Sequence, residues 1–122
     1  MDFKLIKDNL RKYILTKPYL RIIFSPIIHV EFLPLFAFCK SKAKEYRNNN
    51  KPEFDLIMSD VELDEFLDIL LSIADRQYIS FIVNINQPAQ NSPLINLICT
   101  KGIEKEYTIS TLQIFILENA PN

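Results

Sequence analysis

A run of acidic side chains at helical spacing is the part of this sequence best suited to chemistry. Asp60, Asp64 and Asp68 recur every four residues, with Glu62 and Glu65 between them. Residues four apart share one face of an α-helix, so the segment predicts an acidic helix face. That face could dock a basic protein, remain solvated or bind a divalent cation. We expect no metal, because the segment lacks the glycine-bearing loop of an EF-hand.

Side chains for nucleophilic, zinc or phosphate-loop chemistry are scarce. His29 is the single histidine, and Cys39 and Cys99 stand in separate apolar surroundings. One histidine excludes the multi-histidine zinc motifs, and we expect both thiols to be buried in a protein of the reducing cytoplasm. Gly102 is the single glycine, which excludes the glycine-rich loops that cradle nucleotide phosphates. We therefore expect no cofactor and no catalytic activity.

A basic cluster offers an alternative site. Lys40, Lys42, Lys44 and Arg47 follow one another closely and could bind phosphates if they share one face. They could equally complement the dipole at a helix C-terminus. Nucleic acid is the less favoured partner, because the formal net charge is −1 and no nucleic-acid-binding motif is present.

Charge also divides the chain into two halves. Residues 1–51 hold eleven Lys/Arg against four acids, a net charge of +7, and residues 52–122 hold three against eleven, a net charge of −8. Such a separation steers charged partners but does not specify a fold. It indicates a basic protein partner, or a homodimer in which the acidic half of one copy meets the basic half of another.

Two segments in the basic half have helical periodicity. Residues 3–15 place apolar side chains three and four apart after a candidate N-cap, Asp2. Residues 34–48 carry a second apolar stripe and end in asparagines, which tolerate the left-handed conformation of helix exits. Between them, residues 19–33 are compatible with either a strand or a helix.

The acidic segment is the most strongly patterned helix. It extends to about residue 77, and its N-cap is Ser59 or Asp60. If Ser59 is the cap, Glu62 three residues later completes a capping box. The predicted buried face is made of Leu63, Phe66, Leu67, Leu70 and Ile73.

Beyond this helix the apolar period changes from 3.6 to 2, which is typical of strands. Residues 54–58 before the helix, and 78–86, 94–100 and 105–117 after it, are the predicted strands. The last three have short links and predict an antiparallel meander. The apolar phase of the final strand slips, which predicts a β-bulge near Ser110-Thr111.

These elements predict one α+β domain over residues 1–122. We expect two to four helices on one face of a mainly antiparallel sheet of three to five strands that ends in the C-terminal meander. The apolar stretch at residues 22–39 contains two prolines, His29 and Glu31, so no membrane span is expected. No N-terminal signal peptide is expected either.

The favoured hypothesis is a small, non-catalytic cytoplasmic module that binds a basic protein. Immunity proteins and antitoxins perform this physical task when an acidic face covers the cationic active site of a toxin nuclease. One alternative is a nucleic-acid-associated or regulatory protein that uses the basic helices. A second is a small-molecule binder or enzyme that needs no glycine loop.

Overall fold

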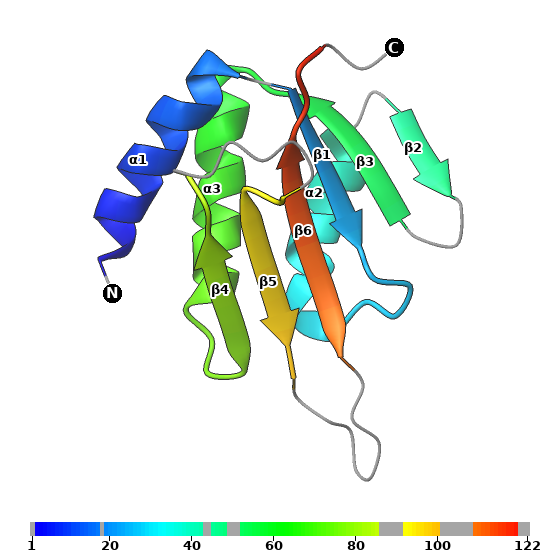
Figure 1. Cartoon of the computed structure of the whole chain (residues 1–122). Helices are drawn as coiled ribbons and strands as arrows, with labels where there is room; N and C mark the ends of the chain where they lie inside the picture. The colour runs from blue at the N-terminus through cyan, green and yellow to red at the C-terminus, as the bar shows by residue number, and fades with distance from the viewer. Residues whose placement is uncertain are drawn as a thin grey trace, which may run out of the picture.

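A central antiparallel sheet organises the chain (Figure 1). The computed structural model describes residues 2–17, 19–42, 45–48, 52–85, 92–100 and 109–119, and of 45–48 only the backbone. In chain order the elements are α1 (Phe3–Thr16), β1 (Tyr19–Phe24), the 3₁₀ helix η1 (Val30–Phe32), α2 (Leu33–Lys42), β2 (Glu45–Asn48), β3 (Pro52–Ile57), α3 (Asp60–Ala74), β4 (Ile79–Val83), β5 (Ile95–Cys99) and β6 (Ser110–Ile116).

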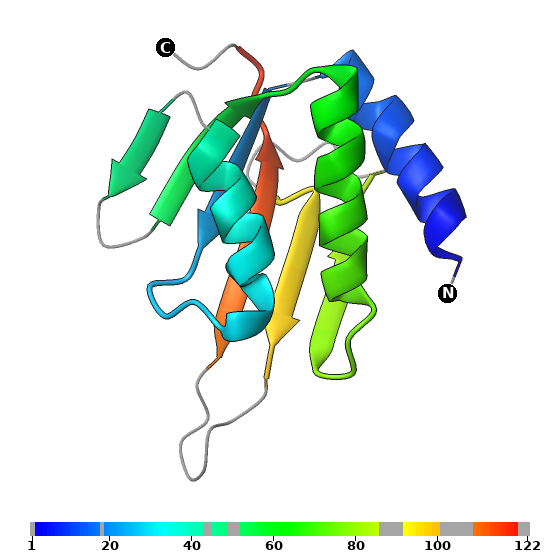
Figure 2. The same ribbon diagram turned by 180° about the vertical axis from the view of Figure 1, so that it is seen from behind.

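Within the described residues the strand order is β2-β3-β1-β6-β5-β4, and every neighbouring pair is antiparallel. Helices α2 and α3 cover one face of the sheet, and α1 packs beside α3 (Figure 2). The expected α+β class is confirmed, with helices on one face and a C-terminal meander formed by β4, β5 and β6. The sheet has six described strands, because β2 adds an edge strand beyond the three to five expected.

The core lies between the sheet and its helical layer. Inward-facing side chains of β1 alternate with outward-facing ones, and Phe24 of that strand is fully buried. Its ring meets the rings of Phe36 and Phe54 edge to face, with centroids 5.3 and 6.0 Å apart. The apolar face predicted for the acidic helix is confirmed by the buried residues Leu63, Phe66, Leu67, Leu70 and Ile73.

The second predicted helix is shorter than expected, and this correction concerns the basic cluster. Helix α2 is described to Lys42, and residues 45–48 form strand β2 instead of continuing the helix. Strand β2 pairs with β3 in the register Glu45↔Asp55 to Asn48↔Pro52. Pairing with a neighbouring strand satisfies the backbone of this segment outside any helix, so tertiary structure overrides the local helical pattern.

The bulge predicted near Ser110-Thr111 is absent from the described part of β6. The register with β5 is continuous from Ser110 to Ile114, and the register with β1 is continuous from Leu112 to Ile116. The phase slip was predicted from the apolar residue Ile109, which is 60% exposed, whereas its neighbour Ser110 is polar but buried on the inward-facing side. The earlier half of the predicted strand, residues 105–108, lies outside the described residues.

The ambiguous segment at residues 19–33 contains both kinds of structure. It forms β1 and then a loop that leads to η1, where the imidazole Nδ1 of His29 accepts a hydrogen bond from the Glu31 backbone N–H at 3.1 Å. The loop is fixed to β6, because the Ser110 hydroxyl donates to the Ile27 carbonyl at 2.8 Å and accepts from the His29 N–H at 3.0 Å. Among the described residues, none of the helices is both long and apolar enough to cross a bilayer.

Candidate functional site

The acidic face begins at a capping box that fixes the start of α3. The Ser59 hydroxyl accepts from the Glu62 N–H at 3.2 Å, and the Glu62 carboxylate accepts from the Ser59 N–H at 3.0 Å. The bond from the Ser59 N–H is the largest cause that lowers the pKa of Glu62, followed by the Ser59 side chain and, more weakly, by the Lys42 ammonium 3.6 Å from the carboxylate. Glu62 is therefore engaged in the helix terminus and less free for a partner than the sequence predicted.

Two further members of the predicted face share one cation. The Lys7 ammonium of α1 lies 2.9 Å from Asp64 and 2.8 Å from Asp68. The Lys7 ammonium donates hydrogen bonds to both carboxylates, and these bonds, that to Asp68 first, raise the pKa of Lys7. The Asp64 and Asp68 side chains are still 50% and 63% exposed, so water and a partner can reach them. Lys7 thus joins α1 to α3 without covering the acidic face.

The other two predicted acids, Asp60 and Glu65, are also exposed. Beside the first turn of α3, the Arg11 guanidinium donates to the backbone carbonyl of Asp60 at 3.2 Å. The face as a whole combines five carboxylates with the cationic groups of Lys7, Arg11 and Lys42, so its formal charge is −2. It is negative, but less so than the sequence alone suggested.

The predicted basic cluster is not a single helix face. Lys40 and Lys42 belong to α2, Arg47 belongs to β2, and Lys44 lies outside the described residues. The Lys40 ammonium stands over the Phe36 ring, 5.8 Å from its centroid, and Lys42 approaches Glu62. The two lysines of α2 therefore have contacts within the protein, which weakens their interpretation as phosphate ligands.

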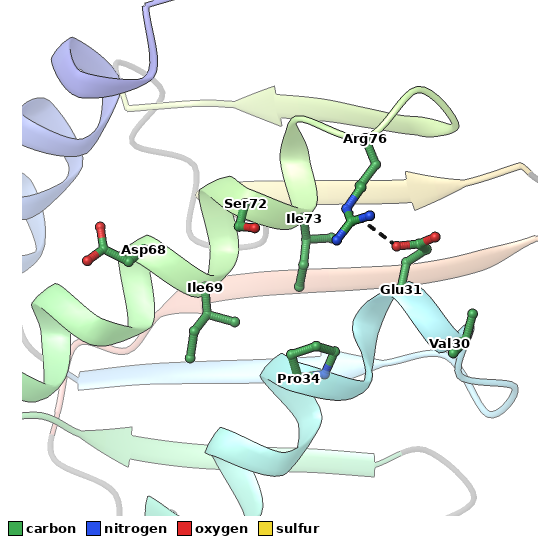
Figure 3. A pocket seen from close by; sticks show the side chains of 8 residues that line it. All are labelled: Val30, Glu31, Pro34, Asp68, Ile69, Ser72, Ile73 and Arg76. Carbon is green, nitrogen blue, oxygen red and sulfur yellow. Dashed lines mark ion pairs between the residues drawn. The ribbon is translucent and has the colours of Figure 1, made fainter.

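An open groove of about 420 Å³ adjoins the acidic face, and sequence reasoning missed it (Figure 3). It lies between α3 on one side and η1 with the start of α2 on the other. Its lining residues are Val30, Glu31, Pro34, Asp68, Ile69, Ser72, Ile73 and Arg76.

The groove has an apolar middle and charged ends. Ile69, Ile73 and Pro34 lie between Asp68 at one end and the ion pair of Glu31 with Arg76, 3.6 Å apart, at the other (Figure 3). Val30 at the rim is 65% exposed, which adds apolar surface outside the groove. Asp68 belongs both to the acidic face and to the groove, so the two surfaces are continuous.

The groove offers apolar surface and charged side chains for contact. Its one hydroxyl belongs to Ser72, and neither a histidine nor a cysteine lines it to activate that hydroxyl. An apolar floor between carboxylates suits a long cationic side chain, because the methylene stem can lie on the floor while the charged head reaches Asp68. No signal in the sequence links residues 30–34 to residues 68–76, since they meet only when η1 packs against α3.

A buried ion pair on β1 and β3 was also missed. The carboxylate of Asp55 is fully buried and accepts from Arg21 Nε at 2.8 Å and from Arg21 Nη2 at 3.1 Å. The two residues face each other in register across the strands. A two-pronged bond of this kind fixes geometry and offsets the cost of burying the carboxylate. We assign it a structural role.

The predictions for the cysteines are confirmed in their burial. Cys39 and Cys99 are both free and fully buried. Desolvation raises the pKa of the Cys39 thiol, which disfavours the reactive thiolate. Neither thiol is positioned as a surface nucleophile.

Among the described residues, no group of three or more His, Cys, Asp or Glu side chains could hold a metal ion. In comparisons with known proteins, no family model, no curated protein and no solved structure matches the chain.

Proposed function

We propose that this protein is a non-catalytic binding module that docks a basic partner protein on the acidic face of α3 and the adjoining groove. The observation that carries the proposal is the shared position of Asp68. Its exposed carboxylate joins the charged surface of Asp60, Asp64 and Glu65 to the apolar floor at Ile69. A negative patch beside an apolar depression offers a partner both attraction and burial.

The two parts of this surface would act at different stages of binding. Exposed carboxylates attract a basic protein during diffusional encounter and raise the association rate at low salt. The groove would then hold an anchoring Lys or Arg, its stem on Ile69 and Ile73 and its head beside Asp68. Interface energy concentrates in such anchor side chains, while exposed charges at the rim contribute less.

A toxin nuclease is the kind of partner we favour. Nuclease active sites are cationic because their substrates are polyanions. An acidic protein surface that fits such a site competes with the nucleic acid for it. An immunity or antitoxin function needs neither a cofactor nor a catalytic group. This function is consistent with the lining of the groove, which has apolar and charged side chains and one serine but no histidine or cysteine.

The alternatives find less support. Nucleic-acid binding would need the basic cluster on one face, whereas its described members are divided between α2 and β2. A small-molecule ligand would need convergent polar groups in an enclosed pocket. Here the groove is open and its middle, at Ile69, Ile73 and Pro34, is apolar.

The test is capture followed by binding kinetics. Wild-type protein is immobilised, exposed to extract of its native host and washed with increasing salt. The identified partner is then purified and its association measured with wild type, with Glu65→Gln/Asp68→Asn and with a control. Asp8→Asn/Asp75→Asn serves as the control, because it removes two exposed carboxylates outside the proposed surface.

We expect a basic protein that elutes with salt and associates more slowly with Glu65→Gln/Asp68→Asn than with the control. These neutral substitutions leave Asp64 to pair with Lys7. Charge reversal at Asp64 and Asp68 would instead place like charges beside Lys7 and would confuse binding with stability. Capture of nucleic acid, or equal association rates for both variants, would show that the proposal is wrong.

A further inference from the structure

Strand β4 forms one edge of the described sheet, and its outer side carries unpaired backbone groups. The Asn84 N–H donates to the Leu94 carbonyl, and the Thr100 N–H donates to the Tyr78 carbonyl. In an antiparallel ladder these bonds alternate, so the even-numbered residues of β4 face β5. The backbone groups of Ile79, Phe81 and Val83 point outward.

Most of these outward groups are available. The Ile79 N–H donates to the Arg76 carbonyl at 3.2 Å. The Ile79 carbonyl and both backbone groups of Phe81 and Val83 have no backbone partner among the described residues. No described strand pairs with β4 on that side. A sheet edge with free donors and acceptors is a template for another strand.

The side chains of β4 lack the protection that edge strands usually carry. Ile79–Val83 has the sequence ISFIV, with no charge and no proline. Ile82 is 45% exposed, and Phe81 and Val83 remain half-buried although their β5 partners, Leu97 and Ile95, are fully buried. Apolar side chains therefore remain accessible at the β4 edge of the sheet. At the opposite edge, β2 includes Glu45 and Arg47, the type of residue that discourages edge pairing.

Helix α1 is the described helix on the outer side of β4 (Figures 1 and 2). Helix α1 lies beyond β4, on the side away from β5, and packs against α3 (Figures 1 and 2). The side chains of Asn9, Lys12, Tyr13 and Thr16 approach Ile85, just after the C-terminal end of β4. The main described contacts of α1 with another element are with α3.

We propose that β4 pairs with β4 of a second copy of this chain, in an antiparallel register centred on Phe81. In this register each Phe81 N–H donates to the Phe81 carbonyl of the other copy, and each Val83 N–H donates to the opposite Ile79 carbonyl. These four bonds use groups that have no backbone partner among the described residues. The two-fold axis makes the interface self-complementary and closed.

A second copy is the favoured occupant because the strand is uncharged and its pattern matches itself. Ser80 of one copy lies opposite Ile82 of the other, and no like charges face each other across the new ladder. This surface is separate from the α3 groove, so the inference does not depend on the proposed function.

The register can be tested by exchanging charges at two exposed positions. Ser80→Lys/Ile82→Lys places lysine opposite lysine twice across the interface. Ser80→Lys/Ile82→Glu places lysine opposite glutamate twice, and is the matched control. The full chain and both variants are examined by sedimentation velocity over a range of concentrations. Circular dichroism and thermal melting of each variant check that the monomer fold is intact.

We expect wild type to reach twice the monomer mass as its concentration rises. The lysine–lysine variant should have a dimer dissociation constant at least about tenfold higher, and the lysine–glutamate variant should recover most of that loss. A wild-type chain that stays monomeric at every concentration overturns the proposal. So does a dimer that the lysine–lysine variant leaves unchanged, or equal weakening by both variants.

Discussion

The carboxylate of Asp55 shows at the scale of one residue how a buried charge depends on its partner. Asp55 is fully buried and holds Arg21 through two hydrogen bonds of 2.8 and 3.1 Å. Arg21→Met leaves the carboxylate buried without this partner, and we expect a loss of about 3–5 kcal/mol in the free energy of unfolding. Urea denaturation measures the loss. The double variant Arg21→Met/Asp55→Leu should recover most of it, and a double variant as unstable as Arg21→Met would contradict the explanation.

Leu67 tests the packing of α3 against the sheet. It is fully buried on the face that the sequence predicted. Leu67→Ala should lower the free energy of unfolding by about 2–5 kcal/mol, because the lost methyl groups leave a cavity. Val61→Ala is the control on the same helix, since Val61 is 79% exposed. A change for Leu67→Ala as small as that for the control would mean that the helix is rotated about its axis.

The candidate site was only partly predictable from its residues. The acidic face and the capping box were predictable, because they depend on contacts between residues three or four apart in one helix. Lys7 on α1 was not identified as the cation that bridges Asp64 and Asp68. The groove was not predictable, because Glu31 and Arg76 are distant in sequence and come together through the packing of η1 on α3.

At the scale of elements, the start of α3 predicts a dependence on pH. The pKa of Glu62 is lowered from its ordinary value of 4.5, first by the bond from the Ser59 N–H. A lowered pKa in the folded state means that the charge stabilises the fold above pH 4.5, and that this contribution is lost as pH falls through the lowered value. Glu62→Gln retains an acceptor for the cap but carries no charge.

Wild type should therefore be more stable than Glu62→Gln at pH 7, and the difference should shrink between about pH 4.5 and lower pH. Thermal melting of both proteins at several pH values measures it. Glu65→Gln is the control, because it removes a carboxylate of the same helix outside the capping box. A stability difference for Glu62→Gln that is the same at pH 7 and pH 3 would exclude the charged cap as its cause.

Elements with a single clear period were predicted well, and elements decided by distant pairing were not. Helix α3 and the strands of the meander have strong patterns of 3.6 and 2 residues. The segment around β2 was predicted as helix because its pairing with β3 leaves no local signature. Ser110 misled the prediction of β6 because a buried hydroxyl, satisfied by Ile27 and His29, has the sequence appearance of an exposed position.

At the scale of the whole molecule, the opposite charges of the two halves meet inside one chain. Lys7, Arg21 and Lys42 of the basic half pair with acids of the other half, and Arg76 pairs with Glu31 in the reverse sense. The formal separation of +7 and −8 in the sequence is therefore partly neutralised by folding. What remains for a partner is the exposed part of the α3 face, which is the basis of the proposed function.

This internal pairing also leads to a prediction about metals. Asp64 and Asp68 are carboxylates on adjacent turns of α3, and the Lys7 ammonium lies within 2.9 Å of both. A divalent cation that entered between them would be repelled by the positive charge of the Lys7 ammonium and would have to displace it. Two carboxylates also supply fewer ligands than the six to eight oxygens that Ca²⁺ takes. The melting temperature should therefore be the same with EDTA, with added Ca²⁺ and with added Mg²⁺.

Differential scanning calorimetry of wild type and Lys7→Met separates the effect of the Lys7 ammonium from the effect of the number of carboxylate ligands. Lys7→Met removes the competing ammonium, so any response to Ca²⁺ should be larger in this variant than in wild type. A fall of several degrees in wild type on addition of EDTA would show instead that these carboxylates belong to a metal site.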